Sequence, residues 1–481
     1  MVFSSIIFLC VFMPIVFITY FLCPAGLRNI LLLVASLVFY AWGEPVYILV
    51  MLFSTFFNYL SGRLVYMFKN RLMPKQAKTV LVISIIESIA VLFLFKYTDF
   101  FIQMVNMFSI KEIPLIGIAL PAGISFYTFQ IMSYTIDVYR GRVEAQKNII
   151  DFAMYVCMFP QLIAGPVVRY EQVAADIHGR KLEWQNIALG FQRFVTGLGK
   201  KVIFANMTGA LWEDIYNASA ADISVLLAWL GAVAYTFQIY FDFSGYSDMA
   251  IGMGQMLGFD FPENFNYPYQ SESITEFWRR WHISLSTWFK EYVYIPLGGN
   301  RKGLPRQVVN LFIVWVLTGL WHGAAWNFVI WGIYFFVLLL IEKWFLLGIL
   351  QKVPKIIRHL YALLFIVIGW VVFACEDSGA LVSYFKALAG AGVPLASDFA
   401  VYKLYTHIIL LLIMALACTK LPKRFMFKIE AMYAAKHPAI DKFYGEKIHF
   451  WIISAFTFIT LILSIALLVS GSYNPFLYFR F

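Results

Sequence analysis

The sequence predicts an all-helical membrane protein that crosses the bilayer several times, and three observations lead to this fold class. Of its 481 residues, 61% are hydrophobic and only 13% are charged, whereas soluble domains carry about 25% charged residues. Repeated apolar runs approach the ~20 residues with which a helix spans a bilayer. These runs, such as 79–95 and 450–469, are apolar on all sides, which excludes the alternating segments of ~10 residues found in membrane β-barrels.

Charge and cysteine content exclude several other classes. The net charge is +10, but the basic residues gather in the links between apolar runs, as cytoplasmic loops and contacts with anionic lipids require. Nucleic acid is therefore not an expected partner. The five cysteines are scattered without a C-x-x-C pair, so neither a metal site nor a disulfide framework is expected. Motifs for nucleotide hydrolysis, zinc proteolysis and serine-elbow hydrolysis do not occur in the sequence.

The basic links predict which side of the membrane each segment meets. Link 62–78 holds five basic residues and no acidic one, so it should be cytoplasmic. Gly-Glu-Pro at 43–45 should break 29–60 into two short helices. Segment 79–95 then crosses outward and 114–139 crosses back. Counting backwards from link 62–78, the two short helices return the chain to the inside, and a first helix over 4–22 places the N-terminus outside.

Segment 148–168 disturbs this count of crossings. It should leave the cytoplasm, yet the segment that begins at Trp184 lies beside basic residues and should also start inside. Pro160 and Gly165-Pro166 indicate a broken, re-entrant segment, which is tolerated at membrane depth only where protein buries it or it lines a cavity.

The second half completes the predicted topology. Segment 224–243 returns inward from an acidic link, and 308–320 with 326–341 form a hairpin of two short helices. Links 343–358 and 420–447 are basic and inside, and a last helix over 450–469 delivers the C-terminus outside. We expect ten or eleven crossings plus at least one re-entrant region. Residues 1–481 form a single transmembrane domain, with core motifs over 120–335 and an extracellular tail over 471–481.

His322 is the sharpest candidate for chemistry. It lies among small residues at the bend of the apolar hairpin, and ionisable side chains at membrane depth usually face an interior cavity. One interpretation is a packed histidine that is hydrogen-bonded to a carbonyl. The other is a general base, because burial favours the neutral imidazole that can accept a proton.

His282 is the second candidate. A capping box at 273–276 predicts a helix that begins near Ile274, and on a continuous helix His282 shares a face with Arg279. This could be an interfacial helix whose arginines meet lipid phosphates. It could also be a cytoplasm-facing site in which Arg279 or Arg280 binds a phosphate-bearing donor.

Two carboxylates, Asp242 and Asp248, occur at the inner end of a predicted span. They could bind an ion or hold a helix break through hydrogen bonds to freed backbone donors. We favour the structural role, because no cluster of partner carboxylates lies nearby in the sequence.

Three runs resemble the signature regions of a known family. They are Phe-Trp-Arg-Arg-Trp-His-Ile-Ser-Leu-Ser at 277–286, Tyr-Ile-Pro-Leu-Gly-Gly-Asn-Arg at 294–301 and Thr-Gly-Leu-Trp-His-Gly-Ala at 318–324. Segments 121–126, 160–166 and 242–248 support them. Together they resemble the membrane-bound O-acyltransferases over nearly the whole chain, and the branch of alginate O-acetylation rather than that of teichoic acid D-alanyl transfer.

The resemblance implies a ring of transmembrane helices around a thin centre, where funnels from the two faces nearly meet. The short hairpin halves and the broken segment around Pro160 would produce this thinning. His322 matches the family's catalytic histidine, and His282 matches a second signature position that the family fills with Asn or His. Such proteins move an acyl group from a cytoplasmic thioester towards an extracellular hydroxyl.

The expected function is therefore O-acetylation of an exported polysaccharide in the bacterial cytoplasmic membrane. The resemblance implies no bound cofactor, a donor such as acetyl-CoA or a carrier thioester near Arg279 and Arg280, and an extracytoplasmic SGNH-type acetyltransferase as partner. His322 would deprotonate the attacking hydroxyl. Asn327, the Trp321 indole or backbone amides near the histidine could stabilise the oxyanion.

The C-terminal run Phe-Leu-Tyr-Phe-Arg-Phe at 476–481 resembles the ending of the small membrane peptide of the D-alanylation system. The resemblance implies that Tyr478 takes the acyl group as an ester, with His322 as base, and passes it to the partner. The alternative is an aromatic anchor at the membrane interface.

Two other function classes stay open at this point. A transporter or flippase for a lipid-linked or acylated substrate predicts inverted repeats with paired broken helices, and only one broken segment is evident in the first half. A non-catalytic scaffold of a polysaccharide machine predicts that His322 is dispensable.

Overall fold

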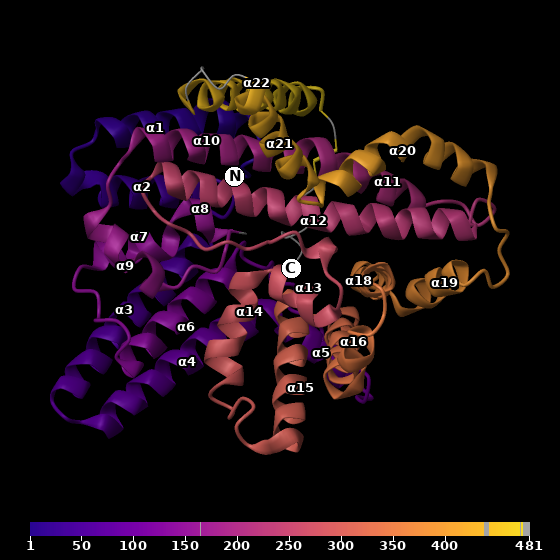
Figure 1. Ribbon diagram of the computed structural model, residues 1–481. Coiled ribbons are helices and arrows are strands. Elements are labelled where there is room, and N and C mark those ends of the chain that lie inside the picture. The colour runs from indigo at the N-terminus through magenta and orange to yellow at the C-terminus, as the bar shows by residue number, and fades with distance from the viewer. Residues whose placement is uncertain (164, 437–441, 472, 475–481) are drawn as a thin grey trace.

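The computed structural model describes residues 1–163, 165–436, 442–471 and 473–474, which form helices and no strand (Figure 1). Eight helical segments among them are long and apolar enough to cross a membrane. They are α3 (Ile48–Asn70), α4 (Pro74–Lys96), α12 (Val225–Met256), α15 (Gly303–His322), α16 (Trp326–Ile341) with its continuation through α17 (Leu347–Leu350), α18 (Lys355–Ala374), α20 (Asp398–Ala417) and most of α22 (Lys442–Val469). The predicted all-helical, multi-pass class is confirmed.

The other helices are shorter. Two of them, α1 (Met13–Leu22) and α2 (Arg28–Ala41), belong to shorter apolar stretches. The remainder connect the long helices or lie among them: α5 (Thr98–Asn106), α6 (Ile124–Arg140), α7 (Ile149–Cys157), α8 (Phe159–Leu162), α9 (Tyr170–Gly179), α10 (Trp184–Gly199), α11 (Asn206–Tyr216), α13 (Ile274–Arg280), α14 (Ile283–Phe289), α19 (Ser378–Leu388) and α21 (Leu421–Lys436).

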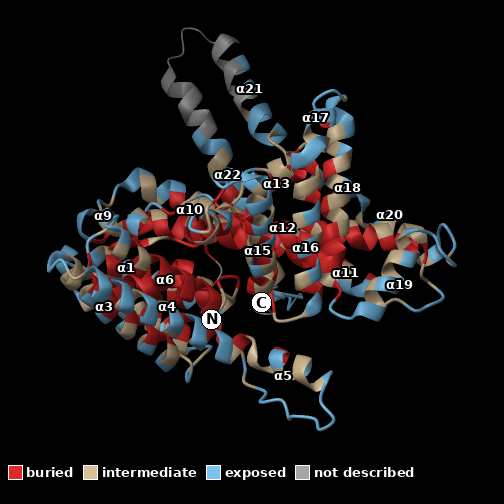
Figure 2. Ribbon diagram, turned by 90° about the horizontal axis from the view of Figure 1, so that it is seen from below, coloured by how far each residue is buried: buried red, intermediate tan, exposed pale blue. Residues whose placement is uncertain are grey.

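Helix α12 passes through the middle of the molecule (Figure 1). In its apolar window 72% of the residues are buried, against 17% in α4, and the buried residues gather around it in Figure 2. Helix α10 packs directly on α12. Their backbones are so close that a Cβ atom added to Gly197 would lie 2.5 Å from the carbonyl oxygen of Gly245. Small residues of this kind allow membrane helices to approach backbone to backbone.

The broken segment predicted around Pro160 is present. Helix α7 ends at Cys157 and α8 covers only Phe159–Leu162, with Met158 between them in a non-helical conformation. All residues over 151–163 are buried. The condition for non-helical backbone at membrane depth, burial within protein, is therefore met, while the re-entrant path stays a prediction.

Two predicted spans have different bounds. The break at 43–45 is present, but α3 continues to Asn70, so the second helix is not short. The segment predicted over 114–139 is helical only from Ile124. Pro121 and the left-handed Gly123 (φ 73°) lie directly before this point and prevent the helix from starting earlier. Helix α6 is buried along nearly its whole length and is an interior helix.

The hairpin around His322 also differs from its prediction. Helix α15 has 20 residues and ends at His322 itself, and α16 continues through a π-helical turn over Glu342–Leu346. The prediction of two short halves was wrong, because α15 begins at Gly303, five residues before the apolar run that starts at Val308. A Cβ atom on Gly319 would lie 2.3 Å from the carbonyl oxygen of Phe328, so α15 and α16 touch through their backbones.

The last described residue is tied to the start of the chain. The Nδ2 atom of Asn474 donates to the carbonyl of Ser4 at 2.8 Å, and its Oδ1 atom accepts from Asn206 at 3.1 Å. Asn474 is therefore held beside the N-terminal segment and α11. Tyr478 lies outside the described residues.

Candidate active site

The chain around His282 is bent by its backbone conformation. Helix α13 begins where the capping box predicts, with the Ser273 hydroxyl accepting a hydrogen bond from the Glu276 amide at 3.0 Å. The prediction of a continuous helix through His282 was wrong. Trp281 is extended and His282 is left-handed (φ 44°, ψ 55°), after which α14 starts, because a left-handed residue cannot continue a right-handed helix.

This bend separates His282 from the two arginines predicted beside it. Arg279 is exposed, and the Arg280 guanidinium donates to the Glu276 carboxylate at 2.6 Å. Neither arginine is brought to the histidine.

The structure instead places His282 beside His322. Their ring centroids are 6.4 Å apart, and the two residues are 1% and 3% exposed. Both ring nitrogens of His282 and Nδ1 of His322 have no hydrogen-bond partner within the described part of the chain. In a neutral imidazole one nitrogen donates and the other accepts a hydrogen bond, so both rings have hydrogen-bonding capacity left for a substrate.

Aromatic rings enclose both imidazoles. Trp331 and Phe373 meet the His322 ring edge-on, with centroids 5.1 and 5.3 Å away, and Phe243 meets the His282 ring at 4.6 Å. Edge-to-face packing fixes the orientation of each ring. Trp331 and Phe373 come from α16 and α18, so their approach to His322 could not be predicted from sequence spacing.

Lys96 is a site residue that the sequence prediction missed. It is 8% exposed, and its ammonium group donates to the main-chain carbonyl of Trp321 and, at 3.1 Å, to the Ser125 hydroxyl. A cation at a helix C-terminus is favourable, and here it lies at the end of α15 beside His322. A lone lysine that closes an apolar run was the signal available in the sequence.

Two polar cavities lie next to residues that flank the histidines, although the histidines themselves line neither cavity. One, called the Gly323 pocket, has a volume of about 280 Å³ and is lined by Lys96, Asp99, Gly323, Ala324 and Glu376 among others. The other, called the Asn264 pocket, has a volume of about 520 Å³, and its lining includes Arg193, Lys200, Ser244, Ser247, Asp248, Asn264 and Lys423.

Asn264 connects its pocket to His282. Its carbonyl accepts from the Ile283 amide at 3.0 Å and its Oδ1 atom accepts from the Ser284 hydroxyl at 2.9 Å, so it holds the first turn of α14. The Nδ2 atom of Asn264 and the hydroxyls of Ser244 and Ser247 have no partner among the described residues. These buried groups give the pocket a polar floor next to the histidine.

The oxyanion candidates differ in their geometry. The Trp321 ring lies 5.1 Å from the His322 ring and 5.8 Å from the His282 ring, and its Nε1 atom has no partner in the described residues. The Asn327 amide donates to the Phe373 carbonyl at 2.9 Å, and the Gly323 amide donates within α15. The geometry therefore favours Trp321.

The carboxylates of α12 lie in ion pairs. Asp242 pairs with Lys201 at 2.6 Å, and both side chains are almost fully buried. Asp248 pairs with Arg193 at 2.9 Å and with Lys200 at 2.6 Å. These contacts join α12 to α10 and to the turn that follows it. Helix α12 is unbroken from Val225 to Met256, so the two carboxylates do not hold a helix break, and side-chain ion pairs take the place of the expected hydrogen bonds to backbone donors.

Fold and site together define a multi-pass membrane protein with a buried histidine pair in its helical core. The model of the MBOAT, membrane-bound O-acyltransferase, family matches residues 143–378, a range that contains both histidines. The chain belongs to the membrane-bound O-acyltransferase family, and it is an acyltransferase.

Similar proteins support this assignment. The "Probable alginate O-acetylase AlgI" of Azotobacter vinelandii is 44% identical over 78% of this chain and 76% of that protein, and the protein of the same name from Pseudomonas aeruginosa is 45% identical over 78% and 72%. The "Peptidoglycan O-acetyltransferase" of Helicobacter pylori is 35% identical over 81% and 80%. The predicted resemblance to the alginate O-acetylation branch is confirmed.

Proposed function

We propose that this protein transfers an acetyl group from a cytoplasmic thioester across the membrane for O-acetylation of an exported polysaccharide. The observation that carries the proposal is the histidine pair, 6.4 Å apart, with the Gly323 pocket beginning at the residue after His322 and the Asn264 pocket joined by hydrogen bonds to the two residues after His282. In the predicted topology Lys423, in the link 420–447, lies on the cytoplasmic side, and Glu376, after the span that follows the cytoplasmic link 343–358, lies outside. A pair of imidazoles near one pocket from each face suits transfer from one face to the other.

The Asn264 pocket is the proposed entry for the donor. Its buried hydroxyls and amide suit the polar groups of a pantetheine arm, and Lys200 and Lys423 add positive charge to its wall. Acetyl-CoA or a carrier thioester would fit this chemistry. The site departs from the one expected at Arg279 and Arg280, because those side chains lie away from the histidines.

His322 is the proposed general base. The acceptor oxygen attacks the thioester carbonyl carbon while the imidazole takes the hydroxyl proton, a role worth roughly 10²- to 10⁴-fold in rate. The Trp321 indole donates to the tetrahedral oxyanion. The carbon–sulfur bond then breaks, and the leaving thiolate recovers the proton from the imidazolium.

The first acceptor in this proposal is the hydroxyl of Tyr478. Asn474, four residues earlier, is anchored to Ser4 and Asn206, and an extended chain covers roughly 3.5 Å per residue. Tyr478 can therefore reach about 14 Å from this anchor. The acetyl ester would pass to an extracytoplasmic SGNH-type acetyltransferase and then to the polysaccharide. The relatives named as alginate and peptidoglycan O-acetylating proteins support a glycan as the final acceptor.

Proteoliposomes loaded with labelled acetyl-CoA test the proposal. We expect covalent label on an acceptor with the wild type and with a control, His178→Ala, whose histidine is exposed. We expect none with His322→Ala. Equal labelling of the His322→Ala variant would refute the catalytic assignment, and movement of label without covalent transfer would indicate a transporter.

A further inference from the structure

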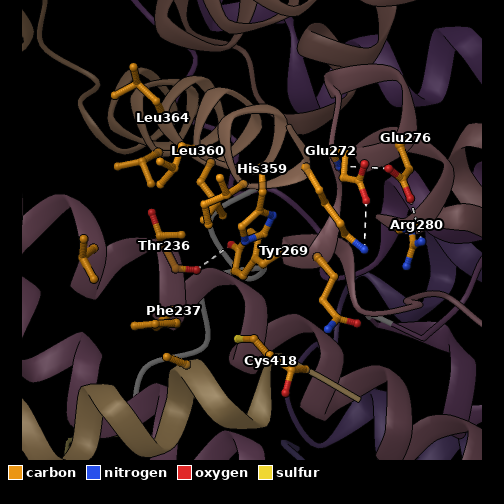
Figure 3. Close-up of a pocket in the computed structure, with 18 of the residues that line it drawn as sticks. Thr236, Phe237, Tyr269, Glu272, Glu276, Arg280, His359, Leu360, Leu364 and Cys418 are labelled. Atoms are coloured by element: carbon orange, nitrogen blue, oxygen red, sulfur yellow. Dashed lines mark hydrogen bonds and ion pairs between the residues drawn. The ribbon is translucent and has the colours of Figure 1, made fainter. Parts of the chain in front are cut away.

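A cavity of about 970 Å³ lies away from the histidine pair, between α12, α18 and the end of α20. We call it the α18 cavity (Figure 3). Phe237 of α12 and Leu360, Leu364 and Val367 of α18 belong to its largely apolar wall. Its lining contains neither catalytic histidine.

Aromatic side chains separate this cavity from the active site. The Tyr269 hydroxyl donates to the Thr236 carbonyl at 2.6 Å (Figure 3), which closes the wall on that side. The ring centroid of Trp281 lies 6.1 Å from that of Tyr269 and 4.7 Å from that of Trp370. Both tryptophans are 1% exposed. These rings therefore stand between the cavity and the core of the protein on that side.

The length of the cavity matches one leaflet of a bilayer. On α18 its lining runs from Lys355 to Val367, which is about 18 Å at 1.5 Å per residue. Half of a ~30 Å hydrocarbon core is about 15 Å. Leu360 is 58% exposed and Leu364 is 44% exposed, so the apolar wall continues onto the lipid-facing surface.

One end of the cavity is charged, with an excess of basic groups. Two acidic residues there are already paired with basic ones: Glu272 with Lys355 at 3.1 Å, and Glu276 with Arg280 at 2.6 Å. Lys420 and Arg424 also line the cavity, and the predicted topology places their link on the same cytoplasmic side as the link that holds Lys355. They take part in none of the ion pairs between described residues, and the Lys420 ammonium lies over the Tyr267 ring at 5.7 Å.

We propose that the α18 cavity binds an anionic phospholipid from the leaflet on the side of the α20–α21 connection. The phosphate lies between Lys420 and Arg424, where charge-assisted hydrogen bonds are available. One acyl chain runs along Leu360 and Leu364 towards Val367. The apolar wall is about as long as one leaflet is deep, and it ends at basic groups that form no ion pair among the described residues. This arrangement fits a phospholipid whose headgroup faces the membrane surface and whose chain points to the bilayer centre.

Native mass spectrometry of the purified full chain tests the headgroup site. We expect retention of phosphatidylglycerol over phosphatidylcholine, reduced at least fivefold in the double variant Lys420→Gln/Arg424→Gln. The control Lys75→Gln/Lys78→Gln removes two exposed charges at the start of α4 and should leave retention unchanged. Equal retention of the two lipids, or the same loss in the control, would overturn the proposal.

Photo-crosslinking tests the chain site. Phosphatidylglycerol with a diazirine near the end of one chain should label α18 or α12 in the wild type, and excess unlabelled phosphatidylglycerol should remove the label. Leu364→Trp should also remove it, with a thermal unfolding curve to verify that this variant is folded. Competition by CoA, or an unchanged crosslink in folded Leu364→Trp, would instead assign the cavity to another ligand and overturn the proposal.

Discussion

The ammonium group of Lys96 donates a hydrogen bond to the main-chain carbonyl of Trp321, the residue directly before His322. This contact ties the end of α4 to the end of α15. We expect Lys96→Met to lower kcat for acetyl transfer at least about tenfold with little change in KM, because misplacing a catalytic group by ~1 Å costs about 10²-fold in rate. Lys96→Arg keeps the charge and should retain more activity than Lys96→Met in steady-state assays.

A matched control exists for this lysine. Lys69 also donates to a main-chain carbonyl, that of Tyr139, at 2.8 Å, but it is not part of the site. Lys69→Met should keep the wild-type kcat. If Lys96→Met retained wild-type kcat, Lys96 would have no role in positioning His322.

The two histidines should behave as one unit. We expect His322→Gln and His282→Gln each to lower kcat/KM by roughly 10²- to 10⁴-fold, and the double variant to be about as impaired as the worse single one, because groups that serve one step are not additive. The same proteoliposome assay measures all three variants. A double variant whose loss is the product of the single losses would show that the imidazoles act independently.

Helix packing next to the site predicts a stability effect. In Gly319→Ala the new methyl group would meet the Phe328 carbonyl oxygen at 2.3 Å, so we expect a loss of about 1–3 kcal/mol in the free energy of unfolding. A Cβ atom on Gly348, which is also helical, would meet nothing within 4 Å. Gly348→Ala should therefore be neutral or stabilising. Thermal unfolding followed by tryptophan fluorescence compares the two variants, and equal melting temperatures would contradict the close approach of α15 and α16.

The buried pair of Lys201 and Asp242 predicts a reciprocal effect. Lys201→Met should destabilise the protein by about 3–5 kcal/mol, because it leaves the buried Asp242 carboxylate without the cation that pairs with it. The double variant Lys201→Met/Asp242→Leu should recover part of this loss. The same unfolding assay makes the comparison, and strictly additive losses would show that the two side chains are not coupled.

Tyr478 predicts a covalent intermediate. In Tyr478→Phe we expect loss of hydroxylamine-sensitive acetyl label from the chain and reduced polysaccharide acetylation, because the accepting hydroxyl is gone. Tyr473→Phe removes a neighbouring hydroxyl and should change neither. Undiminished acetylation in Tyr478→Phe would leave this tyrosine as an interfacial anchor.

The sequence predicted features that depend on local chemistry. Pro160 predicted the break between α7 and α8 because proline removes a helix donor, and His322 stood out as an ionisable residue among apolar ones. The contacts of Lys96 with Trp321 and of Lys201 with Asp242 could not be predicted, because each joins segments that only the packing of the whole fold brings together. The prediction of a continuous helix through His282 was wrong, because the spacing of residues along a sequence does not reveal a single left-handed residue.

The left-handed backbone conformation at His282 restricts which amino acids can occupy this position. Most side chains are strained there, whereas asparagine, aspartate and histidine adopt this conformation several times more often than other residues. The residues that the family resemblance allows at position 282, asparagine and histidine, are two of these three. The amino-acid choice at this position is thus set by steric tolerance as well as by reactivity, and an asparagine could preserve the bend without supplying an imidazole.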